Sequence, residues 1–271
     1  MTDTRPMDAD GSLGAASVTQ EPAVRVTHLT KEYPGIHALE DVSFDMPKGK
    51  LTTIIGPSGC GKTTTLKIVA GLVDPTSGEV VVDGRPVRRP GPERAVVFQD
   101  FALLPWATVL RNVAFGLELR GVGRKEREAM AREYIDKTNL TGFEDAYPYQ
   151  LSGGMRQRVG LARALAVDAD ILLMDEPFAS VDEQIRRKFQ EDLLQLLSGE
   201  RKTVLFITHS IEEAVYLSDQ IVILTRAPGR VSQVVRPGID RTGDSQKIRR
   251  SSAYLDCVDS IWVELRKYLE R

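Results

Sequence analysis

The sequence has few cysteines, no long apolar run and almost no excess charge, and each absence narrows the possibilities. Cys60 and Cys257 are the two cysteines among 271 residues, which excludes a disulfide framework and indicates a reducing compartment. No apolar stretch approaches the roughly 18 residues that a membrane-spanning helix needs. The formal net charge of -2 provides no basic surface for a polyanion, so we expect no nucleic-acid partner.

The two ends of the chain differ in character from its middle. Residues 1–22 are small, polar and acidic, without the apolar centre of a signal peptide, and we expect a disordered N-terminal tail there. A folded domain is predicted over residues 23–236, followed by a short C-terminal extension over residues 237–271. A chain without an export signal or a membrane span is expected in the cytoplasm, where any action on a membrane requires docking to another protein.

A glycine-rich loop between an apolar stretch and a helical pattern organises the chain. Leu51–Ile55 before it is typical of a buried strand, and Thr63–Ala70 after it is typical of a helix. The loop itself consists of Gly56, Pro57, Ser58, Gly59, Cys60, Gly61, Lys62 and Thr63, with Thr64 following. This order matches the phosphate-loop pattern, in which backbone N–H groups point at phosphate oxygens at the positive end of a helix dipole. The alternative is a chance glycine-rich turn before a helix.

Three side chains of this loop have predicted roles. The Lys62 ammonium is expected to reach the β- and γ-phosphates of a nucleotide, and the Thr63 hydroxyl to bind Mg²⁺. Cys60 stands at the helix N-terminus, which favours a thiolate, and it is therefore predicted to be reactive.

The flanking segments predict an α/β fold. Short alternating strands at Val24–Val26, Val42–Met46 and Glu79–Val82 indicate a β-rich part around the loop. Later apolar runs indicate a parallel sheet covered on both faces, because helical patterns at Asp182–Leu197 and Ile211–Leu217 separate them. These runs are Ala95–Phe98, Ile171–Asp175, Thr203–Thr208 and Ile221–Leu224, with a last strand at Val231–Val235.

Two further parts are predicted to be helical. Helical spacing at Val109–Leu119, Lys125–Asn139 and Gly154–Val167 predicts an inserted helical subdomain over about residues 100–167. Near the C-terminus, Asp240–Ser252 is polar, and a short amphipathic helix is expected at Ser260–Leu269.

The apolar run at Ile171–Asp175 ends in two acids, Asp175 and Glu176. The carboxyl end of a strand is where an α/β sheet presents metal ligands to a nucleotide. Asp175 is predicted to hold Mg²⁺, and Glu176 to polarise an attacking water. A solvated acidic turn after an apolar strand is the simpler alternative.

Ser152, Gly153 and Gly154 form a second candidate anion site at a helix start. Ser152 is a good N-cap, and the two glycines leave the N–H groups of the first turn accessible. One ATP has a single γ-phosphate, so either the chain binds two anions or this helix caps a phosphate held by another copy. A plain loop before a helix is the third possibility.

The order of phosphate loop, Leu151–Arg158 and acidic strand resembles that of ATP-binding-cassette (ABC) ATPases. The resemblance covers about residues 23–236 and implies a P-loop NTPase core with an N-terminal antiparallel β subdomain and an inserted α-helical subdomain. It further implies a head-to-tail dimer, in which each ATP lies between one phosphate loop and Ser152–Gly154 of the other copy. The implied reaction is hydrolysis of Mg²⁺-bound ATP to ADP and phosphate.

The resemblance also implies roles for three single residues. Tyr33 matches an aromatic that stacks on adenine, Gln99 a glutamine that touches Mg²⁺ and the water, and His209 a histidine that contacts the γ-phosphate. Without the resemblance, Tyr33 is a packing residue, Gln99 ends its strand and His209 bonds to backbone. The segment Ala179-Ser180-Val181-Asp182 departs from the family's usual Ser-Ala-Leu-Asp or Gly-Ala-Leu-Asp, which puts its contacts across the dimer in question.

The chain has one cassette and no membrane span, so transport requires separate membrane subunits. Leu103–Trp106, Asp175–Phe178 and Thr225–Arg230 are similar to segments of bacterial importers of nitrate, sulfonate and taurine. The implied partners are a second copy, transmembrane permease subunits and, indirectly, a periplasmic or lipid-anchored substrate-binding protein, with the chain on the cytoplasmic face of the membrane. The apolar stretch Asp100–Trp106 is predicted to dock onto the permease, the alternative being that it packs inside the helical insertion.

A soluble ABC ATPase of DNA repair or of the ribosome is the alternative function. Repair types insert a long coiled coil between the phosphate loop and Leu151–Arg158, and no sustained heptads occur there. Ribosome-acting types carry two cassettes, whereas this chain carries one.

Overall fold

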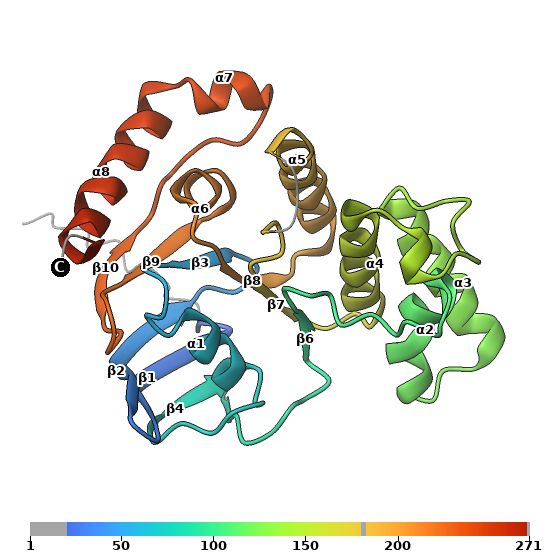
Figure 1. The fold of residues 1–271 in the computed structure, drawn as a ribbon, viewed down its shortest axis with the longest axis horizontal. Helices are drawn as coiled ribbons and strands as arrows, with labels where there is room; N and C mark the ends of the chain where they lie inside the picture. The colour runs from blue at the N-terminus through green and yellow to red at the C-terminus, as the bar shows by residue number, and fades with distance from the viewer. Residues whose placement is uncertain (1–20, 180–182, 270–271) are drawn as a thin grey trace, which may run out of the picture.

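The computed structural model describes residues 21–179 and 183–269, which form two sheets surrounded by helices (Figure 1). The N-terminal tail expected over residues 1–22 lies outside this part up to residue 20. Ser180, Val181 and Asp182 of the divergent loop also lie outside it. No helix in the described ranges combines the length and the apolarity needed to cross a membrane.

The larger sheet has the strand order β10-β9-β3-β8-β7-β6. Its strands are β3 (Leu51–Ile55), β6 (Arg94–Val97), β7 (Ile171–Asp175), β8 (Thr203–Ile207), β9 (Gln220–Leu224) and β10 (Val231–Val235). All neighbouring pairs are parallel except β9 and β10, which are antiparallel. The predicted parallel sheet is therefore confirmed, with an antiparallel strand at one edge.

The smaller sheet is antiparallel, with the order β2-β1-β4-β5. It consists of β1 (Val24–Tyr33), β2 (Ile36–Met46), β4 (Ser77–Val82) and β5 (Arg85–Pro86). The strands β1 and β2 are longer than the short alternating runs predicted them to be, and Pro34-Gly35 joins them in a turn with Gly35 at φ 77°.

Alternate side chains of the central strands enter two different apolar cores, which explains their unbroken apolar runs. In β7, Leu172 and Met174 face a core that contains α6 (Ile211–Leu217), whereas Ile171 and Leu173 face a core that contains α1 (Lys62–Val69) and the smaller sheet. The larger sheet is thus covered by helices on one face and by α1 with the smaller sheet on the other (Figure 1).

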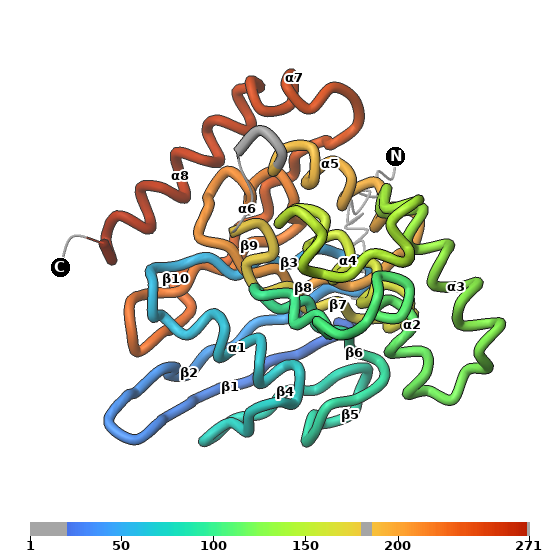
Figure 2. The backbone as a smooth tube through the Cα atoms, turned by 45° about the vertical axis from the view of Figure 1, so that its right-hand side comes forward, coloured from blue at the N-terminus to red at the C-terminus, as the bar shows by residue number. Residues whose placement is uncertain are grey.

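The helical patterns in the middle of the chain are also confirmed. They form α2 (Val109–Leu119), α3 (Arg124–Lys137) and α4 (Gly153–Ala166), and a short 3-10 helix, Pro148–Gln150, precedes α4. In both views these helices form one group beside the edge strand β6 (Figure 1, Figure 2). The helix α5 (Glu183–Glu200) follows β7 and packs through Phe189 and Leu193 into the same core.

The C-terminal prediction was wrong in extent. The stretch expected to be merely polar contains α7 (Ser245–Arg249), and the last helix, α8 (Ser252–Leu269), begins eight residues before the predicted Ser260. Tyr254, Ile261 and Leu265 of α8 are buried, at helical spacing, against the core around α6. The polar residues before Ser260 concealed the pattern because they occupy the exposed face of this helix.

Candidate functional site

Four segments that carry the predicted site residues lie together at the carboxyl ends of the strands of the larger sheet. The strands β3, β8, β7 and β6 are adjacent and parallel, with Ile54 opposite Ile207 and Ile207 opposite Asp175. Their carboxyl ends therefore lie side by side. The phosphate loop leaves β3, Thr208 and His209 leave β8, Asp175 and Glu176 end β7, and Gln99 follows β6 by two residues.

The phosphate loop has the backbone that its glycines predict. Gly59 and Gly61 have φ of 77° and 92°, a left-handed conformation that favours glycine. At Gly61 a side chain is also excluded by space, since a Cβ atom there would lie 2.4 Å from Leu39 Cδ2 of β2. The loop thus rests directly on the smaller sheet.

The Lys62 ammonium lies over the loop that carries it. Lys62 is buried, and its Nζ donates to the carbonyl oxygens of Gly56 at 2.9 Å and Pro57 at 3.1 Å. The loop therefore holds a buried positive charge at the start of α1, the position at which the helix dipole also favours an anion.

Thr63 and Asp175, which the sequence places 112 residues apart, are in contact. The Thr63 hydroxyl donates to Asp175 Oδ1 at 3.0 Å. Burial raises the pKa of the Asp175 carboxyl, an effect that the Thr63 hydrogen bond opposes. A hydroxyl and a carboxylate are hard oxygen ligands of the kind Mg²⁺ prefers, so this pair fits the predicted metal ion.

Glu176 and His209 also meet at these carboxyl ends. Nδ1 of His209 lies 3.1 Å from Oε2 of Glu176, and the His209 side chain is 61% exposed against 22% for Glu176. The Glu176 backbone has φ of 44° and its N–H donates to the Ile207 carbonyl at 3.0 Å. Non-glycine residues in this sparsely populated region often occur at functional sites. Here the backbone conformation accompanies a Glu176 carboxylate that lies against His209 at the carboxyl ends of the strands.

Gln99 and Tyr33 are less closely tied to these residues. Gln99 is exposed beyond the end of β6. Tyr33 ends β1, is 37% exposed, and has the Lys31 ammonium 4.9 Å from its ring centroid. Of the smaller sheet, it is Leu39, six residues after Tyr33, that contacts the phosphate loop at Gly61.

Ser152, Gly153 and Gly154 form the start of α4, as predicted. The Ser152 hydroxyl accepts from the Met155 N–H at 3.3 Å, which makes Ser152 the N-cap. This helix start faces α5, because a Cβ atom on Gly154 would lie 3.1 Å from the Phe189 ring. Arg158, one turn later, stacks on the same ring at 4.5 Å. Ser152 itself is exposed, so its side of the helix start is open to a partner.

The prediction for Cys60 was wrong. The thiol is buried, with 0% of the residue exposed, and desolvation raises its pKa despite the nearby Lys62 ammonium. A helix N-terminus favours the thiolate only where the sulfur keeps some solvation, and here the side chain points into the core beneath the loop.

Gly229 is a neighbour of the loop that the sequence marked only as part of a turn. A Cβ atom on Gly229 would lie 2.1 Å from the Cys60 carbonyl oxygen, and its N–H donates to the Ala38 carbonyl at 3.0 Å. The segment after β9 therefore clamps the phosphate loop against β2. The Pro228-Gly229 pair was the available signal, since a glycine in a turn also permits close approach of another backbone.

The packing alternative for Asp100–Trp106 applies to part of the stretch, and docking of the rest stays a prediction. Phe101 is buried, with its Cβ 3.3 Å from the position that a Cβ on Gly160 of α4 would take. Trp106 is 72% exposed. Leu103 and Leu104 are half-buried, and Leu103 packs on the core around α2–α4.

Comparison with known proteins identifies the family of the chain. Residues 39–179 match the model of the ABC transporter family. An uncharacterised ABC transporter ATP-binding protein of Methanocaldococcus jannaschii is 51% identical over 229 residues, covering 83% of this chain and 86% of that protein. A taurine import ATP-binding protein of Pseudomonas syringae pv. tomato is 53% identical over 203 residues, covering 74% of this chain and 78% of that protein.

A solved structure supplies the same conclusion for the fold. It is the dimeric, post-hydrolysis state of an ATP-binding cassette bound to ADP and phosphate. It is 32% identical, with a TM-score of 0.70 over 82% of this chain and 100% of that one. The sequence relatives, the family model and this likeness agree on the family and the fold. The chain therefore belongs to the ABC transporter family, as an ATP-binding subunit with ATPase activity.

Proposed function

We propose that this chain is the ATP-hydrolysing subunit of an importer for taurine, nitrate, a sulfonate or a related small solute. The catalytic role of the chain is supported by two contacts, Thr63 with Asp175 and Glu176 with His209. Both lie at the carboxyl ends of the strands, next to the phosphate loop. Phosphoryl transfer requires mainly positioning and charge stabilisation, and these groups lie where both are needed.

Each group has a task in this mechanism. Lys62 and the N–H groups of the loop would bind the β- and γ-phosphates, and Thr63, Asp175 and Gln99 would hold Mg²⁺, which would supply positive charge to neutralise the phosphates. Glu176 orients the attacking water and accepts its proton. His209, whose Nδ1 faces Glu176, fixes the Glu176 carboxylate and approaches the γ-phosphate. Tyr33 stacks on adenine.

The site of one chain is incomplete in this proposal. Ser152 is exposed at the start of α4, where Gly154 approaches the Phe189 ring of α5, and no contact places this helix start on the chain's own phosphate loop among the described residues. Ser152 and the N–H groups of Gly153 and Gly154 would contact the γ-phosphate of an ATP held by a second copy, so that ATP joins a head-to-tail dimer and hydrolysis releases it. Pairing of two copies is supported by a similar cassette that is dimeric, and because that dimer persists with ADP and phosphate bound, release would follow the departure of the products.

The membrane partners are inferred from the surface and from the relatives. Trp106 is exposed, five residues after the buried Phe101, and its exposure supports docking to permease subunits at the cytoplasmic face of the membrane. A substrate-binding protein outside the membrane would deliver the cargo. Taurine is the first candidate cargo because a 53% identical relative is a taurine import ATP-binding protein.

The catalytic proposal is tested with Glu176→Gln in the full-length chain. We expect ATP binding to be retained, turnover to fall by about 100-fold or more because the water loses its base, and a dimer to accumulate with ATP. Phosphate release and light scattering measure these outcomes. Glu79→Gln, at an exposed position of β4, is the matched control and should leave both unchanged. Turnover of Glu176→Gln near the wild-type rate would contradict the role.

The cargo proposal is tested separately in membranes. The chain is co-purified with its native permease, reconstituted in vesicles with the binding protein, and supplied with labelled taurine or labelled nitrate. ATP-dependent uptake of taurine is expected. ATP hydrolysis without uptake of either solute would overturn the cargo and leave the ATPase intact.

A further inference from the structure

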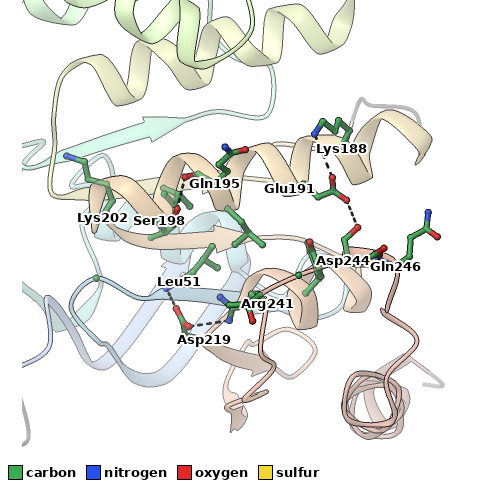
Figure 3. A pocket seen from close by; sticks show the side chains of 18 residues that line it. Leu51, Lys188, Glu191, Gln195, Ser198, Lys202, Asp219, Arg241, Asp244 and Gln246 are labelled. Carbon is green, nitrogen blue, oxygen red and sulfur yellow. Dashed lines mark hydrogen bonds and ion pairs between the residues drawn. The ribbon is translucent and has the colours of Figure 1, made fainter. Parts of the chain in front are cut away.

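The C-terminal helices α7 and α8 are fastened to the helices that follow the catalytic strands. The Ser245 hydroxyl at the start of α7 donates to Glu191 of α5, and the Tyr254 hydroxyl of α8 donates to the Glu212 carbonyl of α6 at 3.1 Å. Glu191 lines a cavity of about 860 Å³, and Figure 3 shows its carboxylate between Lys188 of α5 and the segment that leads into α7. The extension is thus attached to both α5 and α6.

Arg249, the last residue of α7, also contacts both α5 and α6. Its Nη2 donates to Gln190 Oε1 at 2.5 Å, and its guanidinium carbon lies 3.8 Å from the Tyr216 ring centroid of α6. A guanidinium over an aromatic face is attracted to it and held in one orientation. Gln190 is 2% exposed, so Arg249 contacts an amide that is otherwise inside the protein.

The contact continues inward from Gln190. Gln190 Nε2 donates to Glu213 Oε1 at 3.3 Å, and the other carboxylate oxygen, Oε2, accepts from the Thr208 hydroxyl at 2.5 Å. Glu213 and Thr208 are also buried. We call the chain of Arg249, Gln190, Glu213 and Thr208 the C-terminal relay.

The relay ends at the loop that carries His209. Thr208 Oγ1 accepts from the Ser210 N–H at 3.0 Å, and the Ser210 hydroxyl caps α6 by accepting from the Glu213 N–H at 3.3 Å. The residues on both sides of His209 are therefore held by Glu213, while the exposed His209 ring faces Glu176 at 3.1 Å. A buried and fully connected polar network of this kind restricts its members to one arrangement.

We propose that Arg249 is a positioning residue for ATP hydrolysis, which acts through the C-terminal relay to hold His209 against Glu176. The proposal rests on the roles given above to these two residues. Without Arg249, the Gln190 amide has a buried acceptor without its charged donor and is free to turn. Glu213 Oε1 then loses the fixed Gln190 donor and keeps the more distant Arg186 Nε at 3.8 Å, so the carboxylate that holds Thr208 can shift and the His209 ring loses its alignment. The extension thereby adjusts the rate of turnover without touching ATP.

The test compares three variants of the full-length chain in steady-state ATP hydrolysis. Because small misplacement of a catalytic group strongly slows a reaction, we expect Arg249→Ala to lower kcat about tenfold while KM changes less than about twofold. Arg249→Lys, whose ammonium can still donate to Gln190, should recover part of the loss. Arg250→Ala is the matched control, because Arg250 is exposed and adjacent, and it should behave as wild type.

A double-variant cycle separates positioning from a general structural effect. If Arg249 acts through His209, Arg249→Ala lowers the rate in the wild-type background and adds nothing in a His209→Ala background. Single-turnover measurements with radiolabelled ATP resolve the slow rates of the His209→Ala chains. An equal loss in both backgrounds, or an unchanged kcat, would overturn the proposal.

Two further results keep the outcomes distinct. If Arg249→Ala does not fold, Gln190→Met interrupts the relay one step inward and must give the same loss of kcat with the same dependence on His209. If Glu176→Gln and His209→Ala themselves turn over normally, the proposed function fails. If they lose turnover and Arg249→Ala does not, the relay alone fails.

Discussion

The close approach of Gly229 to the phosphate loop predicts that Gly229→Ala damages both stability and ATP binding. The added Cβ would lie 2.1 Å from the Cys60 carbonyl oxygen and 3.4 Å from Leu39 Cδ2. The backbone at Gly229 cannot easily move away from Cys60, because its N–H donates to Ala38 and its carbonyl accepts from Glu40, both in β2. The methyl group must therefore displace the loop from β2.

The magnitude follows from the cost of overpacking. Inserting a methyl group into a well-packed position costs about 1–3 kcal/mol. In a domain of this size, that corresponds to a fall in Tm of roughly 2–12 °C. The displaced Cys60 carbonyl belongs to the loop that binds phosphate, so the dissociation constant for ATP is expected to rise as well. Thermal unfolding followed by circular dichroism, and titration with ATP, measure the two effects.

The control is Gly199→Ala in α5. A Cβ atom at Gly199 has no neighbour within 4 Å, and alanine is preferred to glycine in a helix by up to about 1 kcal/mol. Its Tm should stay constant or rise slightly, and ATP binding should be unchanged. If Gly229→Ala matched this control in Tm and in ATP affinity, the clamp of the loop by the segment after β9 would be refuted.

Two other predictions concern buried titratable groups. Cys60 should resist iodoacetamide in the native chain at pH 8 and react once the chain is unfolded in urea, because its thiol is buried and its pKa is raised; rapid native alkylation of Cys60 seen by peptide mass spectrometry would contradict this. Burial, assisted by the charge of Glu200, raises the pKa of Tyr134 from 10.0 to about 12, so the stability that this group contributes is complete below pH 10 and is lost as the pH rises toward 12. Tyr134→Phe has no phenol to ionise and should not show this loss. Urea titrations should therefore show the unfolding free energy of the variant rising relative to that of the wild type between pH 8 and pH 11. A difference that stayed constant would count against the raised pKa.

Much of the fold was predictable because it depends on local patterns. The apolar runs of β7, β8 and β9 and the helical spacing of α2 and α6 gave bounds within one residue of those observed. The extent of α8 was missed because its buried face consists of widely spaced residues, Tyr254, Ile261 and Leu265, whose partners on α6 are remote in sequence. The environment of Cys60 was missed for the same reason, since burial depends on what packs around the sulfur.

The phosphate loop can be identified without a structure, because that motif is a local arrangement of glycines, a lysine and a threonine before a helix. The same holds for the acidic end of β7, where an apolar run ends in Asp175 and Glu176. Which of these groups are in contact depends on the tertiary structure. Thr63 reaches Asp175, and His209 reaches Glu176, because neighbouring parallel strands bring their carboxyl ends to one edge. The link from Arg249 to Thr208 crosses three helices, and no spacing along the chain encodes it.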